Sequence, residues 1–257
     1  MRVATWNVNS LRARLDRVLA WLAQRQPDVL LMQETKLGDD AAPYLPFELA
    51  GYRLAHHGEG RWNGVAIASR VGLDDIQPGL EASGPDAVGA RMLAARCGGL
   101  RVVSLYAPNG RAVDSEFYLA KLDWFARLRG WLDRAADPAE QLVLGGDLNV
   151  APGDDDVWDP AAFEGATHVT PQEREAYRHL LGWGLVDVYR QHHPEPGRYT
   201  WWDYRAGAFH KGQGMRIDHL LVSRTVASRC RGAEIDRDAR KGPLPSDHAP
   251  LWIDLEG

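Results

Sequence analysis

Val29-Leu30-Leu31-Met32 is an unbroken apolar run that stops at Gln33-Glu34. A run without polar alternation indicates a strand that is covered on both faces. Residues 2–8 are predicted to form a first strand, with polar and apolar side chains on opposite faces. Apolar residues then recur at helical spacing over residues 11–25, which predicts a helix. This strand–helix–strand order predicts a layered α/β domain.

The rest of the chain continues the pattern of short strands and longer helices. Further strands are predicted at 52–55, 64–69, 91–96, 100–107, 141–144, 199–203, 216–223 and 249–254. Helices are predicted at 114–135 and 171–182, where Pro171 suits a first helical turn. Residues 151–165 are rich in Asp, Pro and Gly and are expected to form an exposed loop. No repeat or linker interrupts the sequence, so we expect a single domain that spans residues 1–257.

Composition and charge narrow the class of protein. Of the 257 residues, 45% are hydrophobic and 25% charged, as in an ordinary globular protein. No apolar run approaches the roughly 20 residues of a membrane span, and the N-terminus lacks the pattern of a signal peptide. The two cysteines, Cys97 and Cys230, lie far apart in the sequence. A disulfide between them is not excluded, but so few cysteines favour a reduced, cytoplasmic setting.

The formal net charge is −5. This argues against a protein that coats nucleic acid without specificity, because such proteins are usually basic. An enzyme that acts on nucleic acid remains open, since bound cations and a local arginine patch supply a positive field.

Polar groups stand at the ends of several predicted strands. They are Asn7-Val8-Asn9, Glu34, Asp147-Leu148-Asn149, Asp218 and Asp247-His248. Open α/β sheets bring such groups together at strand termini. Neighbours on a strand point to opposite faces, so Asp247 and His248 serve one site only if they lie in a turn, and Pro245 and Pro250 favour that turn.

The chemistry of these groups favours a hard cation. Carboxylate and amide oxygens suit Mg²⁺ or Mn²⁺, whereas zinc sites use clustered Cys and His. A cation held by carboxylates and phosphate oxygens polarises a phosphodiester for attack by water. Asp218 is a candidate to orient His248 or keep it charged, and Asp147 to take a proton from the attacking water. The residue types leave open whether Asp147 or His248 is the general base.

Six motifs in order resemble the exonuclease III family, the abasic-site endonucleases of the endonuclease/exonuclease/phosphatase superfamily. They are Thr5-Trp6-Asn7-Val8-Asn9-Ser10-Leu11-Arg12, Gln33-Glu34-Thr35-Lys36, Leu105-Tyr106-Ala107-Pro108-Asn109-Gly110, Gly146-Asp147-Leu148-Asn149, Arg216-Ile217-Asp218 and Ser246-Asp247-His248-Ala249-Pro250. Each is weak alone, but together they are specific and cover nearly the whole chain. The resemblance implies a four-layer α/β sandwich with two packed mixed β-sheets flanked by helices.

The resemblance also implies roles for individual residues. Glu34 matches the principal Mg²⁺ ligand, and the candidate metal set comprises Asn7, Glu34, Asp147, Asn149, Asp247 and His248. The candidate catalytic set comprises Tyr106, Asp147, Asn149, Asp218 and His248. Tyr106 matches a tyrosine that contacts the scissile phosphate, with Asn109 beside it. In that family, water displaces the 3′-side leaving oxygen and leaves a 5′ deoxyribose phosphate.

Substrate choice depends on other residues. Trp201, Met215 and Ile217 match a small apolar pocket that receives a base-less sugar, and Arg216 is a candidate phosphate contact. Some members carry a bulkier aromatic residue where Met215 stands, which leaves the tightness of this pocket open. Aromatic neighbours stack bases for roughly 1–3 kcal/mol each.

The sequence therefore predicts a Mg²⁺-dependent DNA repair nuclease. Its expected substrates are double-stranded DNA with abasic sites or blocked 3′ ends, with incision 5′ to the lesion, 3′→5′ exonuclease activity and 3′-end cleaning. It is expected to be a monomer without a membrane partner. Two alternatives stay open: a phosphodiesterase of the same fold that acts on RNA or a small phosphoester, and a DNA-binding relative without catalysis.

Overall fold

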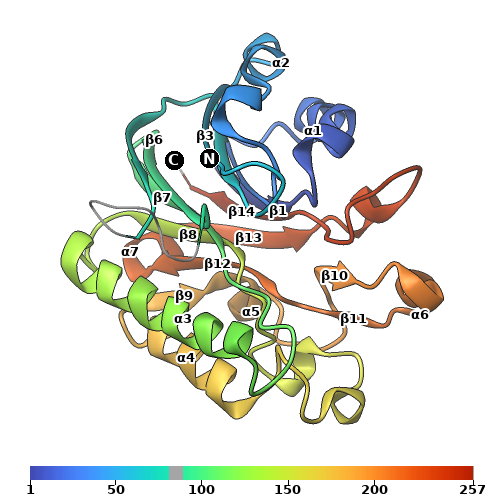
Figure 1. Cartoon of the computed structure of the whole chain (residues 1–257). Coiled ribbons are helices and arrows are strands. Elements are labelled where there is room, and N and C mark those ends of the chain that lie inside the picture. The colour runs from blue at the N-terminus through green and yellow to red at the C-terminus, as the bar shows by residue number, and fades with distance from the viewer. Residues whose placement is uncertain (81–88, 257) are drawn as a thin grey trace.

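Two six-stranded β-sheets pack face to face in the computed structural model, which describes residues 1–80 and 89–256 (Figure 1). The first sheet has, in spatial order, β13 (Cys230–Ile235), β14 (Leu251–Leu255), β1 (Arg2–Asn7), β2 (Val29–Gln33), β4 (Val65–Ser69) and β3 (Arg53–His57). The second has β5 (Asp74–Pro78), β6 (Met92–Cys97), β7 (Leu100–Tyr106), β8 (Leu142–Asp147), β12 (Asp218–Ser223) and β9 (Leu185–Asp187). A separate ribbon joins β10 (Trp201–Trp202) to β11 (Gly214–Met215).

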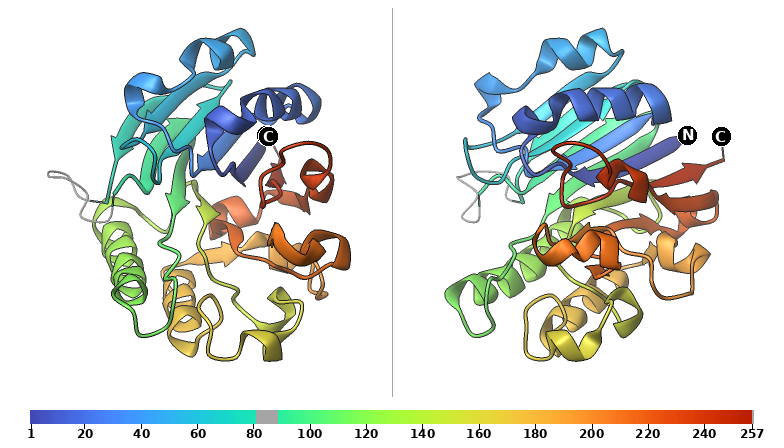
Figure 2. Two further views of the ribbon diagram at one scale, coloured as in Figure 1. Left: turned by 45° about the vertical axis from the view of Figure 1, so that its right-hand side comes forward. Right: turned by 90° about the vertical axis from the view of Figure 1, so that its right-hand side faces the viewer.

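Helices cover the outer faces of both sheets. In Figure 1, α1 (Leu11–Arg25) and α2 (Tyr44–Leu49) lie above the pair of sheets, whereas α3 (Glu116–Ala135) and α4 (Pro171–Leu181) lie below it. The two further views in Figure 2 show the same separation. Three shorter helices are α5 (Val188–His192), α6 (Ala208–Lys211) and α7 (Arg224–Ala227). The predicted four-layer α/β sandwich is therefore confirmed.

Three apolar layers hold the sheets and helices together, and strand β2 contributes to two of them. Val29 and Leu31 belong to the core between the sheets, while Leu30 and Met32 belong to the core beneath α1. All four are fully buried, and complete burial of such a side chain contributes roughly 1.5–3 kcal/mol. The unbroken apolar run is thus explained, because both faces of β2 are covered. A third apolar core lies between the second sheet and α3 and α4.

Helix boundaries follow local capping. The Ser10 side chain accepts a hydrogen bond from the Ala13 N–H at the start of α1, and Gln26 ends that helix in the left-handed conformation. At α4, Thr170 and Glu173 form a reciprocal capping box and Pro171 occupies the first turn. These caps explain why the predicted ranges 11–25 and 171–182 agree with the helices to within a residue.

Some elements lack a strong sequence signal. Strand β5 is an edge strand exposed throughout, so it shows no apolar alternation. Strand β9 has only three residues, and α2 is a helix of six. Within residues 1–80 and 89–256, no helix combines the length and apolarity needed to cross a membrane. Cys97 and Cys230 are both buried free thiols.

Candidate active site

Three neighbouring strands of the second sheet place their polar residues in one row. Tyr106 at the end of β7 pairs with Asp147 at the end of β8, and Asp147 pairs with Asp218 at the start of β12. Because β7 and β8 are parallel and β12 is antiparallel to β8, these residues share one edge of the sheet. The predicted convergence of Asp147 and Asp218 is confirmed.

The first sheet delivers its polar residues to the same place. Asn7 ends β1, and Glu34 follows β2, which runs parallel to β1. The Asn7 amide donates to Glu34 Oε1 at 2.8 Å and to Asp147 Oδ2 at 2.9 Å. One buried side chain therefore joins carboxylates carried by the two sheets.

Residues 246–250 form the expected turn before β14. Ser246 Oγ donates to the Asn7 carbonyl at 2.7 Å and accepts from the His248 N–H at 3.2 Å. Asp247 turns toward Asn9, whose amide donates to Asp247 Oδ1 at 2.9 Å. His248 turns the other way, with Nδ1 2.8 Å from Asp218 Oδ2. The turn thus lets neighbouring residues face different partners.

His248 lies between two carboxylates. Its Nε2 is 3.8 Å from Asp147 Oδ2, on the side opposite Asp218. Burial lowers the pKa of His248, but the charges of Asp218 and Asp147 outweigh it and raise the pKa to about 10. The imidazole is therefore charged at neutral pH.

Asp147 has an environment suited to a base. Burial raises its pKa, the nearby His248 charge lowers it, and Asp218 and Glu34 raise it again, so the net shift is upward. A general base works best with a pKa near the working pH. The upward shift also reflects an excess of negative charge in the buried site.

The donor set and charge suit a divalent cation. Ligand atoms of Glu34, Asp147 and His248 all lie within 4.8 Å of one another. Of these three groups the two carboxylates are the better candidates, because Mg²⁺ prefers oxygen ligands. The Lys36 ammonium is 2.9 Å from Glu34 Oε2 and 2.5 Å from Asn9 Oδ1, which shows that these oxygens attract a cation.

Of the other predicted metal candidates, Asn7 and Asn149 have amide groups that are already engaged. Asn7 Oδ1 accepts from the Asn9 N–H at 3.0 Å. The Asn149 amide donates to the Ala107 carbonyl at 3.0 Å, and its oxygen accepts from Asn109 at 3.3 Å. Asp247 Oδ2 accepts from Trp201 Nε1 at 3.1 Å. These contacts orient the groups around the two carboxylates.

Tyr106 lies at the same edge and is half-buried. Burial, the charges of Glu34 and Asp147, and a hydrogen bond with Glu34 raise its pKa well above the usual value. The phenol therefore keeps its proton and serves as a donor. The Arg91 guanidinium lies over its ring, 4.7 Å from the centroid, and restricts the ring's orientation.

The predicted apolar pocket residues do come together. Trp201 on β10 pairs with Met215 on β11, and Ile217 belongs to the same apolar cluster. Met215 is 1% exposed and Ile217 is 2% exposed, whereas Trp201 is partly exposed. Trp201 is thus the member of this trio that offers surface to a substrate.

Arg216 requires a correction. Its side chain is 0% exposed and lies 2.6 Å from Asp156 Oδ1 and 2.8 Å from Asp187 Oδ2. The prediction that Arg216 contacts substrate is wrong, because both carboxylates bind the guanidinium inside the protein. The expectation that residues 151–165 form an exposed loop is also wrong in part. Asp156 is buried where it binds Arg216, and Ala151 and Val157 are buried in an apolar cluster.

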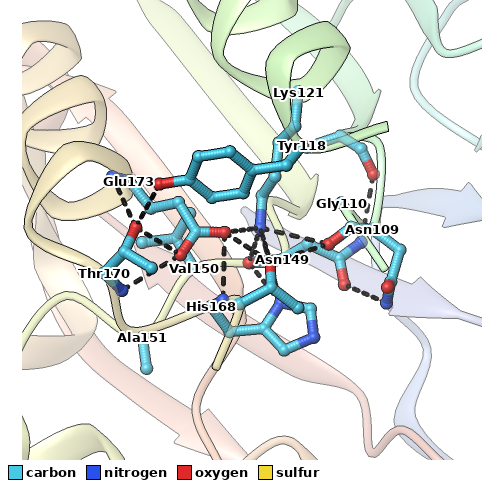
Figure 3. Close-up of polar contacts among 12 residues, drawn as sticks. Asn109, Gly110, Tyr118, Lys121, Asn149, Val150, Ala151, His168, Thr170 and Glu173 are labelled. Atoms are coloured by element: carbon cyan, nitrogen blue, oxygen red, sulfur yellow. Dashed lines mark hydrogen bonds and ion pairs between the residues drawn. The ribbon is translucent and has the colours of Figure 1, made fainter. Parts of the chain in front are cut away.

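A second polar cluster lies behind Asn149 and was not predicted as part of the site. It centres on Lys121 of α3 and Glu173 of α4, with His168 beside them (Figure 3). The sequence did carry one signal, because Lys121 occupies a position in the otherwise apolar stripe of α3. Asn9 and Lys36 were likewise not assigned roles, although they lie within the motifs.

Known proteins resemble this chain over nearly its whole length. The profile of the Endonuclease/Exonuclease/phosphatase family matches residues 4–248. The chain belongs to this family. Within it, the chain is 34% identical to exodeoxyribonuclease III of Haemophilus influenzae, with 100% of both chains covered.

Solved structures of family members superpose closely. An AP endonuclease from Archaeoglobus fulgidus has a TM-score of 0.96 and 38% identity, with 100% of both chains covered. A 3′ phosphatase of Neisseria bound to a product DNA hairpin has a TM-score of 0.96 and 40% identity, again with 100% of both chains covered. The exonuclease III resemblance and the fold predicted from it are confirmed.

Proposed function

We propose that this protein is a Mg²⁺-dependent DNA repair phosphodiesterase that cuts 5′ to abasic sites, removes nucleotides from 3′ ends and clears blocked 3′ ends. One observation carries the proposal. Glu34, Asp147 and the Asp218–His248 pair converge from two sheets at one strand edge, as phosphoester hydrolysis requires. The catalytically silent alternative is disfavoured because this set is complete.

Glu34 would hold the metal, with Asp247 close by through Asn9. Bound Mg²⁺ would neutralise charge on the phosphate ester. The charged His248 offers an N–H at Nε2 to a phosphate oxygen, and Asp218 keeps it charged and oriented. Asp147 accepts the proton of the attacking water, since its raised pKa favours proton uptake. Tyr106, on the neighbouring strand, offers a hydrogen bond from its phenolic O–H to the phosphate.

DNA is the favoured substrate because the similar proteins are named as enzymes that act on DNA. The chain resembles an exodeoxyribonuclease III, an AP endonuclease and a 3′ phosphatase solved with product DNA. Trp201 adds a partly exposed aromatic face beside Asp247, suited to packing against a sugar or a base.

The test uses two duplexes, one with a single abasic analogue and one with a 3′-phosphate at a nick. Each is incubated with the protein in Mg²⁺ and in chelator. We expect incision 5′ to the abasic analogue and release of inorganic phosphate from the nick, both only with metal. Absence of both products in Mg²⁺, with turnover of RNA or soluble inositol phosphates instead, would reject the proposal.

A narrower candidate is 3′-end processing without abasic incision. It is favoured by the near-complete burial of Met215 and Ile217, which leaves little open apolar surface for a base-less sugar. The Neisseria 3′ phosphatase is similar to this chain over its full length. Phosphate release from the nick without incision at the abasic analogue would identify this activity.

We further propose that the protein works as a monomer in the cytoplasm. The two cysteines are buried free thiols, which suits a reducing compartment. Sedimentation of the purified protein at micromolar concentration should give one species near its 28.6 kDa chain mass. A stable dimer would contradict this part of the proposal.

A further inference from the structure

Lys121 and Glu173 form an ion pair that is sealed inside the protein. Lys121 Nζ lies 2.5 Å from Glu173 Oε1, and both side chains are 0% exposed. They come from α3 and α4, which lie side by side below the second sheet (Figure 1). Such a pair incurs a large desolvation cost, and apolar residues of similar volume often fill its place without loss of stability. Packing alone therefore does not explain its presence.

The lysine also binds two backbone carbonyls, as Figure 3 shows. Its Nζ donates to the Asn149 carbonyl at 2.6 Å and to the Asn109 carbonyl at 3.3 Å. The shortest contacts of the ammonium are with Glu173 and these two carbonyls, while Thr167 Oγ1 and His168 Nδ1 are each 3.4 Å away. His168 Nδ1 donates to the same Asn149 carbonyl at 2.6 Å. One buried cation thus ties together the loops that follow β7 and β8.

Those two loops carry groups of the active site. Asn149 adopts a left-handed backbone conformation, with φ of 52°, and its N–H donates to Asp147 Oδ1 at 2.9 Å. The Asn109 amide donates to Asn149 Oδ1 at 3.3 Å. An asparagine held in this sparsely populated conformation needs support from its surroundings. Lys121 supplies it from behind, out of reach of substrate.

Glu173 in turn fixes the lysine. Its Oε1 accepts from Thr167 Oγ1 at 2.6 Å and from the His168 N–H at 3.0 Å, while Oε2 accepts from Thr170. The carboxylate therefore has partners on both oxygens and holds the ammonium at one place. The contacts run continuously from the start of α4 to Asp147.

We propose that Lys121 and Glu173 are positioning residues for phosphoester hydrolysis. Lys121 acts through the carbonyls of Asn109 and Asn149 and thereby sets the orientation of Asp147, whereas Glu173 acts through Lys121. This rests on the proposed function of the site. It assigns a role in the reaction to two side chains that touch neither substrate nor metal.

The test compares four variants on the DNA duplex that the wild-type protein turns over fastest. They are Lys121→Met, Lys121→Met with Glu173→Gln, Glu173→Gln alone, and Tyr118→Phe. The double variant leaves no unpaired charge in the core. Tyr118→Phe removes a 2.7 Å contact between Tyr118 and Thr170 in the same cluster without touching either carbonyl. Melting curves precede kinetics, and rates are measured well below each melting temperature.

We expect both variants that lack Lys121 to lose about 10- to 100-fold in kcat, with KM changed less than about threefold, because misplaced groups slow the reaction without weakening DNA binding. Glu173→Gln keeps the lysine and its carbonyl contacts, so its kcat should fall less. Tyr118→Phe should retain wild-type kcat even if its melting temperature falls.

Three results would overturn the proposal. The first is a wild-type kcat in Lys121→Met or in the double variant. The second is a larger drop in kcat in Glu173→Gln than in Lys121→Met, because Glu173 is proposed to act only through the lysine. The third is a drop in kcat in Tyr118→Phe as large as that in Lys121→Met. If both Lys121 variants fail to fold, Glu173→Gln decides the question. A kcat unchanged from wild type overturns the proposal, and a reduced kcat at unchanged KM supports it. An inactive wild-type protein would instead reject the proposed function, so the two failures are distinguishable.

Discussion

Asp218 Oδ2 lies 2.8 Å from Nδ1 of His248, and both side chains are almost completely buried. The carboxylate comes from the start of β12 and the imidazole from the turn before β14, so the contact joins the two sheets. Because the pair excludes water, the negative charge acts strongly on the imidazole and keeps it protonated. The site therefore presents a fixed positive group beside Asp147 before any substrate arrives.

Replacing Asp218 with Asn should lower kcat by about 100-fold or more, within the range for loss of a positioned acid–base group. The amide keeps the shape of the side chain but cannot hold His248 charged. KM for DNA should change little, since Asp218 is buried. Steady-state kinetics on the nicked 3′-phosphate duplex measure this, with a melting curve as the folding control. A kcat within twofold of wild type would contradict the role assigned to the pair.

Chelation should abolish activity, and Mg²⁺ should restore it. Glu34→Gln should need at least about tenfold more Mg²⁺ for half-maximal rate, because a neutral amide is a weaker ligand for a hard cation than a carboxylate. The matched control is Asp40→Asn, which removes an exposed carboxylate a few residues away. If the wild type, Glu34→Gln and Asp40→Asn need the same Mg²⁺ concentration for half-maximal rate, Glu34 is not a metal ligand.

Replacing Arg216 with Met should reduce stability without weakening DNA binding by the folded protein. The change leaves Asp187 buried without the Arg216 guanidinium and leaves Asp156 with Arg190 alone, and breaking such a buried pair costs about 3–5 kcal/mol. Urea melts measure the loss. Arg224→Met, at an exposed site on α7, serves as control and should shift stability by no more than about 0.5 kcal/mol. A stable Arg216→Met protein with a raised KM would restore the original prediction of substrate contact.

Stability should fall in acid because His219 is buried as the neutral form. Burial first, and then the Arg216 charge, lower its pKa to about 4 although Asp187 opposes the shift. The unfolded chain takes up the proton near the ordinary value of about 6.5. The stabilising contribution is therefore complete above that pH and is lost as the pH falls toward 4, by roughly 3 kcal/mol.

Urea melts at pH 7 and pH 4.5 test this. His219→Gln should be less stable than wild type at pH 7 but should show a smaller loss between the two pH values. The exposed His210→Gln should keep the wild-type slope. An unchanged slope in His219→Gln would show that other groups govern the acid sensitivity.

Sequence periodicity predicted the fold wherever a pattern of apolar residues is compatible with only one kind of element. The apolar run of β2 has to be covered on both faces, and the stripe of α1 between Ser10 and Gln26 has to face a sheet. Strand β5 is held by backbone pairing at an edge, and its side chains are all exposed, so its sequence shows no apolar pattern.

The active site was predictable in part for a similar reason. Glu34 follows an apolar strand and Asp147 ends one, and at both places the pattern of residues marks the change from core to site. Arg216 occupies such a place too, yet its charge is used inside the protein. Lys121 and Glu173 are 52 positions apart, and no local pattern links them.

The sequence by itself determined the layered α/β class, the strand ends that carry oxygen ligands and the hydrolytic chemistry these ligands suit. Only the tertiary structure decided that His248 is charged, that Arg216 is sealed between two carboxylates and that Lys121 lies behind Asn149. Burial, and the spatial distance between residues that are far apart in the sequence, are properties of packing. They set both the protonation state and the partner of each polar group, and neither is encoded in the identity of a residue alone.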